Sequence, residues 1–348
     1  MAQIESRPGS HSLMNLKSAI VSFLVVVLSV LILSSGGISQ ATSPQAVTNQ
    51  NPSNVRSKIS IYDLETKNVR VIYEADKLWE APNWSPDGRY LLANSGGTLY
   101  RFLLDTGGKE APEKLALDAA YGCNNDHGLS PDGKLLAFSA NIGSAQESRV
   151  FVAFPDGARA VLITENHPSY FHGWSPDGKW LAFVGKRGDH LNIFRIPAGG
   201  SEQQLTSIAA NDDGPDYSPD GKWIYINSNR SGGWDIWRLP ADGAGPGDGN
   251  AERVTSDELE DWFPHPSPDG KWLVFLSFPK GTLGHDVKTN VQLRMMPMPP
   301  TAAHIAETDT TGSIQILTQF FGGQGTINVN SWSPDSKKFA FVSYELLP

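Results

Sequence analysis

The chain has 348 residues, 39% of them hydrophobic and 19% charged, which is enough length and apolar content for a substantial core. Its net charge of −9, without a basic stripe, argues against nucleic acid or an anionic membrane surface as a partner. The single cysteine, Cys123, excludes an intrachain disulfide and the CxxC patterns of metal and redox sites. The 34 glycines and 24 prolines are spread widely, which favours many short turns over long helices.

Residues 1–41 have the pattern of a targeting segment. A weakly basic start is followed by a 15-residue apolar run at 19–33, and the small residues Ser39 and Ala41 suit a signal-peptidase site. Because a membrane span needs about 20 apolar residues, we expect a cleaved signal peptide and a periplasmic or secreted protein. The alternative is an uncleaved N-terminal anchor, which would be the protein's only link to a membrane. Residues 42–54 are polar and aperiodic, as in a linker.

The remainder of the chain is organised by a repeated tetrapeptide, SPDG. It stands at 85–88, 130–133, 175–178, 218–221 and 267–270, and a sixth copy, SPDS, stands at 333–336. The successive intervals are 45, 45, 43, 49 and 66 residues. A period in the forties that is built from strands is typical of the blades of a β-propeller.

The third unit, residues 172–206, shows the parts of one blade. HGW belongs to a short inner strand, and SPDG forms a turn in which Pro176 presets φ, Asp177 bonds the backbone and Gly178 accepts positive φ. KWLAFVG, LNIFRIP and EQQLT then follow as a second, third and short outer strand. Each unit therefore predicts a four-stranded blade.

The two ends of the chain complement each other. NSWSPDSKKFAFVSYE, near the C-terminus, supplies only the first two strands of a unit, and SKISIYDLETKNVRVIYE, residues 57–74, supplies only the last two. We therefore predict an all-β fold, a six-bladed β-propeller of four-stranded blades over residues 55–346, without a second domain. The ring is expected to close with two strands from each terminus, which leaves no open sheet edge.

Blades of the form WSPDGKWLAFVG…LNIFRIPAGG…QLT resemble the TolB-type propeller repeat, and the resemblance covers nearly all of the chain after residue 54. It implies a periplasmic protein that binds partners, although we expect no counterpart of the N-terminal α/β domain of TolB. The repeat also resembles that of the oligogalacturonate lyases, which implies a metal site of His and Gln. Those enzymes have seven blades and two His soon after the Gln, whereas Gln324 is followed here by GTINVN.

Function is expected in the residues that break the repeat, because the repeat itself specifies only architecture. The segment before each turn should come from a loop between blades, and the six loops should meet around one mouth of the central channel. These segments are WEAPNW (79–84), NNDHGL (124–129), SYFHGW (169–174), DDGPDY (212–217), DWFPHP (261–266) and NVNSW (328–332). His127 and His172 occupy the same register in adjacent blades, so we expect them to point into the channel side by side.

Two further segments belong to the expected site. An enlarged loop at 279–290 carries His285 and should lie on the same face, and a glycine-rich stretch at 320–330 carries Gln324. Residues 299–313 are expected to form a surface excursion. The candidate ligand-binding residues are Glu80, Asn125, Asp126, Tyr170, Asp216, Trp262, Arg294, Asn328 and Asn330. The candidate metal ligands are His127, His172, His265, His285 and Gln324.

Each candidate also has a structural interpretation. The histidines can bond backbone groups or carboxylates inside a polar channel, and the aspartates of the fourth unit, Asp212, Asp213 and Asp216, can bond amides of the next blade. Arg294 can form a salt bridge between blades, although it lies near enough to the enlarged loop to bind a carboxylate. The sequence alone leaves both interpretations open.

Two function hypotheses follow. The first is an exported, monomeric binding module that holds a small molecule, an oligosaccharide or a periplasmic protein and needs no cofactor; the absence of GxSxG, HExxH and phosphate-loop motifs favours it. The alternative is a metal-assisted carbohydrate-active enzyme, a lyase or a glycoside-cleaving enzyme, acting on an acidic oligosaccharide with Mn²⁺, Zn²⁺ or Ca²⁺. Its candidate catalytic residues are His172, as base, and Asp213. A hydrolase that pairs Glu80 with Asp213 is a weaker third hypothesis, because those residues lie on opposite sides of the ring.

Overall fold

The structure is a computed structural model that describes residues 54–105, 110–286, 288–299 and 313–348. The predicted signal peptide, almost all of the predicted linker and most of the predicted excursion at 299–313 lie outside these ranges. Within them, no helix is long and apolar enough to cross a membrane.

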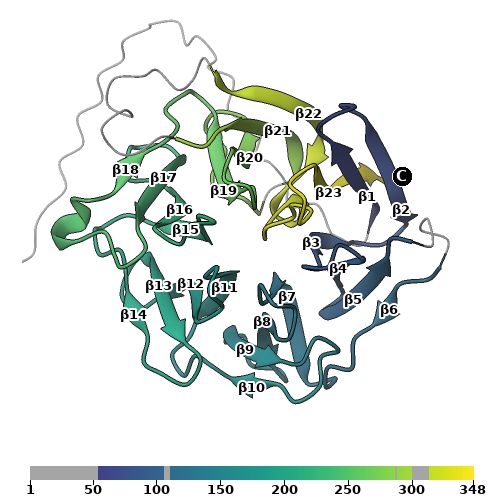
Figure 1. Cartoon of the computed structure of the whole chain (residues 1–348), viewed down its shortest axis with the longest axis horizontal. Helices are drawn as coiled ribbons and strands as arrows, with labels where there is room; N and C mark the ends of the chain where they lie inside the picture. The colour runs from purple at the N-terminus through teal and green to yellow at the C-terminus, as the bar shows by residue number, and fades with distance from the viewer. Residues whose placement is uncertain (1–53, 106–109, 287, 300–312) are drawn as a thin grey trace, which may run out of the picture. The chain divides into compact units, whose positions relative to one another are not determined.

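Six antiparallel sheets stand around a central axis as the blades of a propeller (Figure 1), which confirms the predicted fold class. In the five complete blades the first strand in chain order faces the axis and the fourth lies at the outer rim. Blade one contains β3 (Glu80–Trp84), β4 (Tyr90–Ser95), β5 (Thr98–Leu103) and β6 (Glu113–Lys114), and blade two contains β7 (Tyr121–Leu129), β8 (Leu136–Ile142), β9 (Arg149–Ala153) and β10 (Val161–Leu162). Blade three contains β11 (Ser169–Trp174), β12 (Trp180–Lys186), β13 (Leu191–Pro197) and β14 (Gln203–Gln204), and blade four contains β15 (Asp212–Tyr217), β16 (Trp223–Ser228), β17 (Asp235–Pro240) and β18 (Glu252–Arg253). Blade five contains β19 (Glu260–Pro266), β20 (Trp272–Phe278), β21 (Thr289–Pro297) and β22 (Gln315–Gly322). The 3₁₀ helices of the described residues include η2 (Pro246–Asp248) and η5 (Gln324–Thr326).

The sixth blade joins the two ends of the described chain, as the sequence predicts. β1 (Val55–Asp63) pairs on one side with β2 (Val69–Ala75) and on the other with β23 (Lys338–Leu346). The ring is therefore closed by strands from both termini. This blade has three strands rather than the four expected, and the segment expected to form the fourth, residues 328–332, keeps one isolated bridge to β23, from Trp332 to Phe339.

The repeated SPDG turns have a common hydrogen-bond pattern that explains their composition. In the first turn the Ser85 hydroxyl donates to the Asp87 carboxylate at 2.7 Å and accepts from the backbone N–H of Tyr90 at 3.1 Å. The hydroxyl bond from Ser85 is the main reason why the pKa of Asp87 falls to about 2. Gly88 closes the turn at φ 74°, in the left-handed region that favours glycine. The same serine to aspartate bond recurs in the other five turns.

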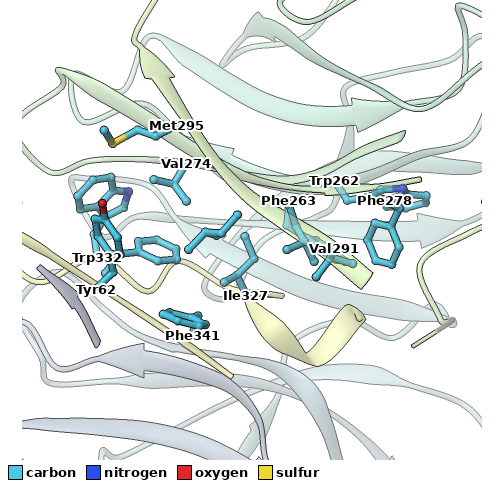
Figure 2. Packing of buried hydrophobic residues seen from close by; sticks show 13 residues of the cluster. Tyr62, Trp262, Phe263, Val274, Phe278, Val291, Met295, Ile327, Trp332 and Phe341 are labelled. Carbon is cyan, nitrogen blue, oxygen red and sulfur yellow. The ribbon is translucent and has the colours of Figure 1, made fainter. Parts of the chain in front are cut away.

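The hydrophobic core is divided into clusters that lie within and between neighbouring blades. One cluster brings Trp262 of blade five together with Tyr62 and Phe341 of blade six (Figure 2). Ile327 and Trp332, which belong to the segment between η5 and β23, contribute to the same cluster. A fully buried large apolar side chain stabilises a fold by about 1.5–3 kcal/mol, so this packing fixes the segment against the ring.

Candidate functional site

The segments predicted as loops leading into the inner strands are largely the inner strands themselves, and five of them carry an irregularity. The antiparallel register shifts within β3, β7, β11, β15 and β19. A bulge inserts an extra residue and redirects side chains locally. In this chain the shifts fall at Glu80/Asn83, Cys123/His127, Phe171/Gly173, Asp213/Asp216 and Trp262/His265. The polar candidates of the sequence analysis thus cluster at the bulges of strands that face the axis.

Residues 327–331, which we call the central segment, lie inside the ring formed by these strands. The chain between β22 and β23 runs on the inner side of the ring (Figure 1). Ile327, Asn328, Val329 and Ser331 are at most 1% exposed, although the segment belongs to no strand. Buried backbone outside secondary structure needs hydrogen-bond partners, and the five other blades supply them.

The central segment is bonded to the inner strand of every other blade. Its carbonyl groups and asparagine side chains are the points of attachment. Asn83 of blade one donates to the Asn330 carbonyl at 2.5 Å; Asn328 donates to Asp126 of blade two at 2.5 Å; His172 Nδ1 of blade three lies 3.2 Å from the Asn328 carbonyl; Asn330 donates to Asp216 of blade four at 2.8 Å; and His265 Nε2 of blade five lies 2.6 Å from the Ile327 carbonyl. The side chains that break the repeat therefore hold a segment of the same chain.

A second set of contacts ties the enlarged loop of blade five to blade four. The structure confirms this loop between β20 and β21, and it carries His285 inward. His285 Nε2 lies 3.0 Å from one carboxylate oxygen of Asp213, and His172 Nε2 lies 3.3 Å from the other. Gln324 contributes to these contacts through its backbone, because its N–H donates to the His285 carbonyl at 3.1 Å. Asp213 thus bridges two histidines from different blades.

Burial and these contacts set the charges at the core of the channel. Burial raises the pKa of Asp126 to about 6. Burial also opposes the charge on Asp213, but hydrogen bonds from His172 and His285 outweigh it and hold the pKa of that carboxyl well below its usual range. For His172, burial is outweighed by Asp213 and by the charge of Asp126, so its pKa is raised. The contacts therefore favour the charged forms of His172 and Asp213 against the effect of burial.

The predicted metal ligands do not form a fitting set of donors. Within the described ranges, no group of three or more His, Cys, Asp or Glu side chains has an arrangement that holds a metal ion. His172 and His285 direct Nε2 at the same carboxylate, and both ring nitrogens of His265 lie against acceptors, Asp216 and Ile327. Donor atoms that already bond to one another leave no common open point for a metal.

Metal analysis of the purified full chain without a histidine tag checks this arrangement. We expect well under one equivalent of Mn, Zn or Ca by mass spectrometry, because both ring nitrogens of His265 and the Nε2 atoms of His172 and His285 are engaged within the protein. A His172→Ala/His285→Ala variant should give the same result. One equivalent in the wild type that the variant loses would contradict this arrangement and support the metal-assisted enzyme.

The channel holds a cavity of about 420 Å³ at the end where the inner strands finish and the SPDG turns begin. The prediction placed the site at the opposite mouth, where the inner strands start; there Asn125, Asp126, Asp213 and Asn328 are all at most 8% exposed. The prolines of all six turns line the cavity: Pro86, Pro131, Pro176, Pro219, Pro268 and Pro334. The residue just before each turn serine lines it too: Trp84, Leu129, Trp174, Tyr217, Pro266 and Trp332.

The remainder of the cavity wall includes polar side chains. They are Asn83, Ser85, His127, His172, Asp216 and Asn330, so four of the predicted site residues lie here and Asn83 and Ser85 are additions. The Asp216 carboxylate is paired with His265 Nδ1 at 3.0 Å. The sequence signal for the apolar lining was available, since the position before the turn is apolar in all six units.

His127 is the least satisfied polar side chain in this wall. It is fully buried, and neither ring nitrogen has a hydrogen-bond partner of good geometry among the described residues. Burial lowers its pKa from 6.5 to about 4, although the backbones of Leu92 and Ala81 favour the charged ring. The neutral imidazole is therefore the form that the fold accommodates.

His127→Leu should reduce the acid sensitivity of the fold. A histidine whose folded pKa lies below its unfolded value contributes stability above about pH 6.5, and this is lost as the pH falls toward about 4. The wild type should therefore lose about 3 kcal/mol more than His127→Leu across that window, measured by urea unfolding at each pH. His190→Leu, at a partly exposed site in the β12–β13 hairpin, should keep the wild-type profile. Equal losses for the two variants would contradict the prediction.

Four other candidates lie outside the cavity lining. Trp262 is 1% exposed and packs against Trp234 with ring centroids 3.9 Å apart, so its faces serve the core. The guanidinium of Arg294 forms ion pairs with Asp257 and Asp261, both at 2.5 Å. These pairs engage the guanidinium inside blade five. Glu80 is half-buried, and desolvation raises its pKa, while Tyr170 is half-buried near Asp126 and Asp213.

Together, the fold and the site define a six-bladed β-propeller whose central channel is filled at one end by its own chain and open at the other. The family model described as TolB beta propeller domain (PD40) matches residues 156–296. An uncharacterized protein of Agrobacterium fabrum, Atu1656, is 42% identical over 291 residues, which are 83% of this chain and 93% of the relative. The chain therefore belongs to the TolB-type β-propeller family.

Solved structures agree with this assignment. A TolB-type protein from Agrobacterium tumefaciens superposes with a TM-score of 0.76 at 42% identity and covers 84% of this chain and 99% of its own. TolB from Acinetobacter baumannii shares the fold at a TM-score of 0.54 and 20% identity, over 71% of this chain and 62% of its own. An oligogalacturonate lyase from Vibrio parahaemolyticus shares the fold at 0.51 and 11% identity, over 82% of each chain. The last two similarities concern the fold alone.

Proposed function

We propose that this protein is an exported binding propeller that holds its ligand in the channel cavity lined by the prolines of the six SPDG turns, which we call the turn-face cavity. The observation that carries the proposal is the open cavity of about 420 Å³ with an apolar, aromatic wall and a few polar side chains. Small-molecule sites are commonly pockets of about 300–1,000 Å³ with this mixture of lining groups. The occupant is a free small molecule or a group that projects from a periplasmic protein partner. Export is proposed from the apolar run at 19–33, which precedes the described residues.

The architecture supports a rigid, preformed site. Six turns from six blades surround the mouth, and the turn glycines pack against neighbouring turns: positions that a side chain at Gly133 and Gly178 would occupy lie 3.8–3.9 Å from Pro86 and Pro131. The central segment, bonded to five blades, forms the base below. A ligand that enters such a site pays little ordering cost in the protein, which favours affinity.

A thermal-shift screen of a small-molecule library on the full chain tests the proposal. Leu129 lines the cavity at 9% exposure, so Leu129→Trp should fill part of it, whereas Leu129→Met keeps the volume. Ligands that stabilise the wild type and Leu129→Met, but not Leu129→Trp, would support binding in the cavity. Ligands that stabilise all three equally, or a screen without any ligand, would contradict it.

The metal-assisted carbohydrate-active enzyme is supported by one observation, the convergence of His172 and His285 on Asp213. These groups satisfy one another and are at most 16% exposed, so they present no free base to a substrate. The metal analysis described above decides between this alternative and the binding propeller.

A further inference from the structure

One outer sheet edge of the propeller is long and carries no charge. β22 is the last strand of blade five at the rim (Figure 1), and its outer edge pairs with no other strand of the described chain. It spans eight residues, whereas the outer strands of blades one to four span two residues each. Its sequence, QILTQFFG, has neither a charged residue nor a proline, while the other long outer strand, β2, carries Arg70 and Glu74. Because exposed edges are usually protected by short strands, charges or proline, β22 has the properties of an edge that accepts a further strand.

The second half of β22 keeps a regular register. A bulge can also protect an edge, but the register shift of this pair falls between Leu293 and Arg294 of β21, and the stretch from Thr318 to Gly322 pairs one to one with that strand. A regular antiparallel strand directs the N–H and C=O groups of every second residue away from its partner. Residues 318–322 therefore offer free backbone groups with which an incoming strand can pair.

A pocket of about 390 Å³ lies beside this regular stretch. Its wall includes three carboxamides, Asn290, Gln292 and Gln319, together with apolar side chains such as Leu259 and Phe320. Asn290 and Gln319 are exposed and Gln292 is half-buried, and none of the three has a hydrogen-bond partner in the described part of the chain. No ionisable side chain belongs to the described lining. The pocket therefore offers accessible, neutral donors and acceptors.

The three carboxamides share one face of blade five. Ser277, Gln292 and Gln319 are cross-strand neighbours on β20, β21 and β22, and Asn290 lies two residues before Gln292 on the same strand. A strand that paired with the outer edge of β22 would place one side chain at the end of this row, about 4.5–5.5 Å from Gln319 between Cβ atoms. Because a carboxamide donates and accepts, the matching side chain carries a carboxamide or a hydroxyl group.

We infer that the outer edge of β22 and this pocket form a binding site for an extended, uncharged peptide strand of another protein. The peptide pairs with the backbone of residues 318–322 and places a carboxamide or hydroxyl side chain against Gln292 and Gln319. Backbone pairing supplies affinity in such sites, and the pocket supplies selectivity. The pocket shares no lining residue with the turn-face cavity, so this inference goes beyond the proposed function and does not depend on it.

Selection of a phage-displayed random heptapeptide library on the immobilised full chain tests the inference. Enriched peptides should carry a carboxamide or hydroxyl side chain at a central position between β-branched or aromatic residues. Their synthetic forms, measured by fluorescence polarisation, should bind Gln319→Lys at least tenfold more weakly, because the variant places a charge at the edge. Gln292→Leu should weaken them about tenfold through lost hydrogen bonds.

Two variants and one further measurement locate the peptide. Gln315→Leu changes an exposed residue of the same strand outside the pocket, and it should stay within about twofold of the wild type. Leu129→Trp, in the turn-face cavity, should also leave the affinity unchanged. Hydrogen exchange should show slower exchange of backbone amides within residues 318–322 when the peptide is bound. Circular dichroism of each variant confirms that loss of binding is not loss of fold.

The contrary outcomes are distinct from those of the proposed function. A selection that enriches no peptide, or peptides whose affinity is unchanged in both Gln319→Lys and Gln292→Leu, overturns the inference. Peptides that Leu129→Trp abolishes and Gln319→Lys does not affect also overturn it, and they support the binding propeller. A dimer of the free chain in analytical ultracentrifugation that Gln319→Lys dissociates would assign the edge to a second copy and overturn it as well.

Discussion

Removal of residues 338–348 is expected to abolish folding of the propeller. β23 pairs with β1 along its whole length, from Val55 opposite Leu346 to Asp63 opposite Lys338, and it accepts the bridge from Trp332. Without it, β1 keeps a single partner strand and exposes an unpaired edge between blades five and one. The truncated chain should show no cooperative thermal transition by circular dichroism and should aggregate in size-exclusion chromatography.

A shorter truncation provides the matched control. Removing Leu347 and Pro348 loses one backbone hydrogen bond, from the Leu347 N–H to the Asn54 carbonyl at 2.9 Å. This variant should unfold within a few degrees of the full chain, since one such bond contributes about 1 kcal/mol. A stable, monomeric protein that lacks residues 338–348 would contradict closure of the ring by the two termini.

Arg294→Ala is expected to be the most damaging point substitution that we can identify. The guanidinium is 6% exposed and contacts Asp257 and Asp261, while its Nε donates to the Ser277 hydroxyl at 2.6 Å. The substitution leaves Asp261 as a buried carboxylate without its cation, so the free energy of unfolding should fall by about 3–5 kcal/mol. Urea unfolding at pH 7 measures the loss.

An exposed ion pair of the same type is the control for Arg294. Arg89 is 78% exposed and lies 2.6 Å from Asp87 in the first SPDG turn. Because solvent screens such pairs, Arg89→Ala should change the free energy of unfolding by about 1 kcal/mol or less. If the two substitutions cost the same, the buried cluster in blade five does not carry the stability assigned to it.

The fold could be predicted from the sequence because each of its levels leaves a local pattern. The serine and aspartate of SPDG bond each other within the turn, and Gly178 and its equivalents supply the positive φ that the turn needs. The spacing of these turns gives the number of blades. Complementary half-units at the two ends give the closure.

The site could be predicted only in part, because its contacts join residues that are far apart in sequence. Asn328 meets Asp126 across 202 residues, and Asn330 meets Asp216 across 114. No local pattern indicates that the expected strand at 328–332 leaves its blade for the channel. The polar side chains before the turns were correctly recognised as departures from the repeat, but much of their bonding capacity is used on the central segment. The open cavity lies on the opposite face, among turn residues that appeared purely structural.

The central claim is that the inner-strand side chains hold the central segment inside the channel. A double-mutant cycle with Asp126→Ala, Asn328→Ala and the combined variant tests it most directly by urea unfolding. The two side chains are buried and bonded at 2.5 Å, so we expect a coupling free energy of about 1–3 kcal/mol. Effects that add to within about 0.5 kcal/mol would show that the two residues do not interact and would contradict the account of the channel.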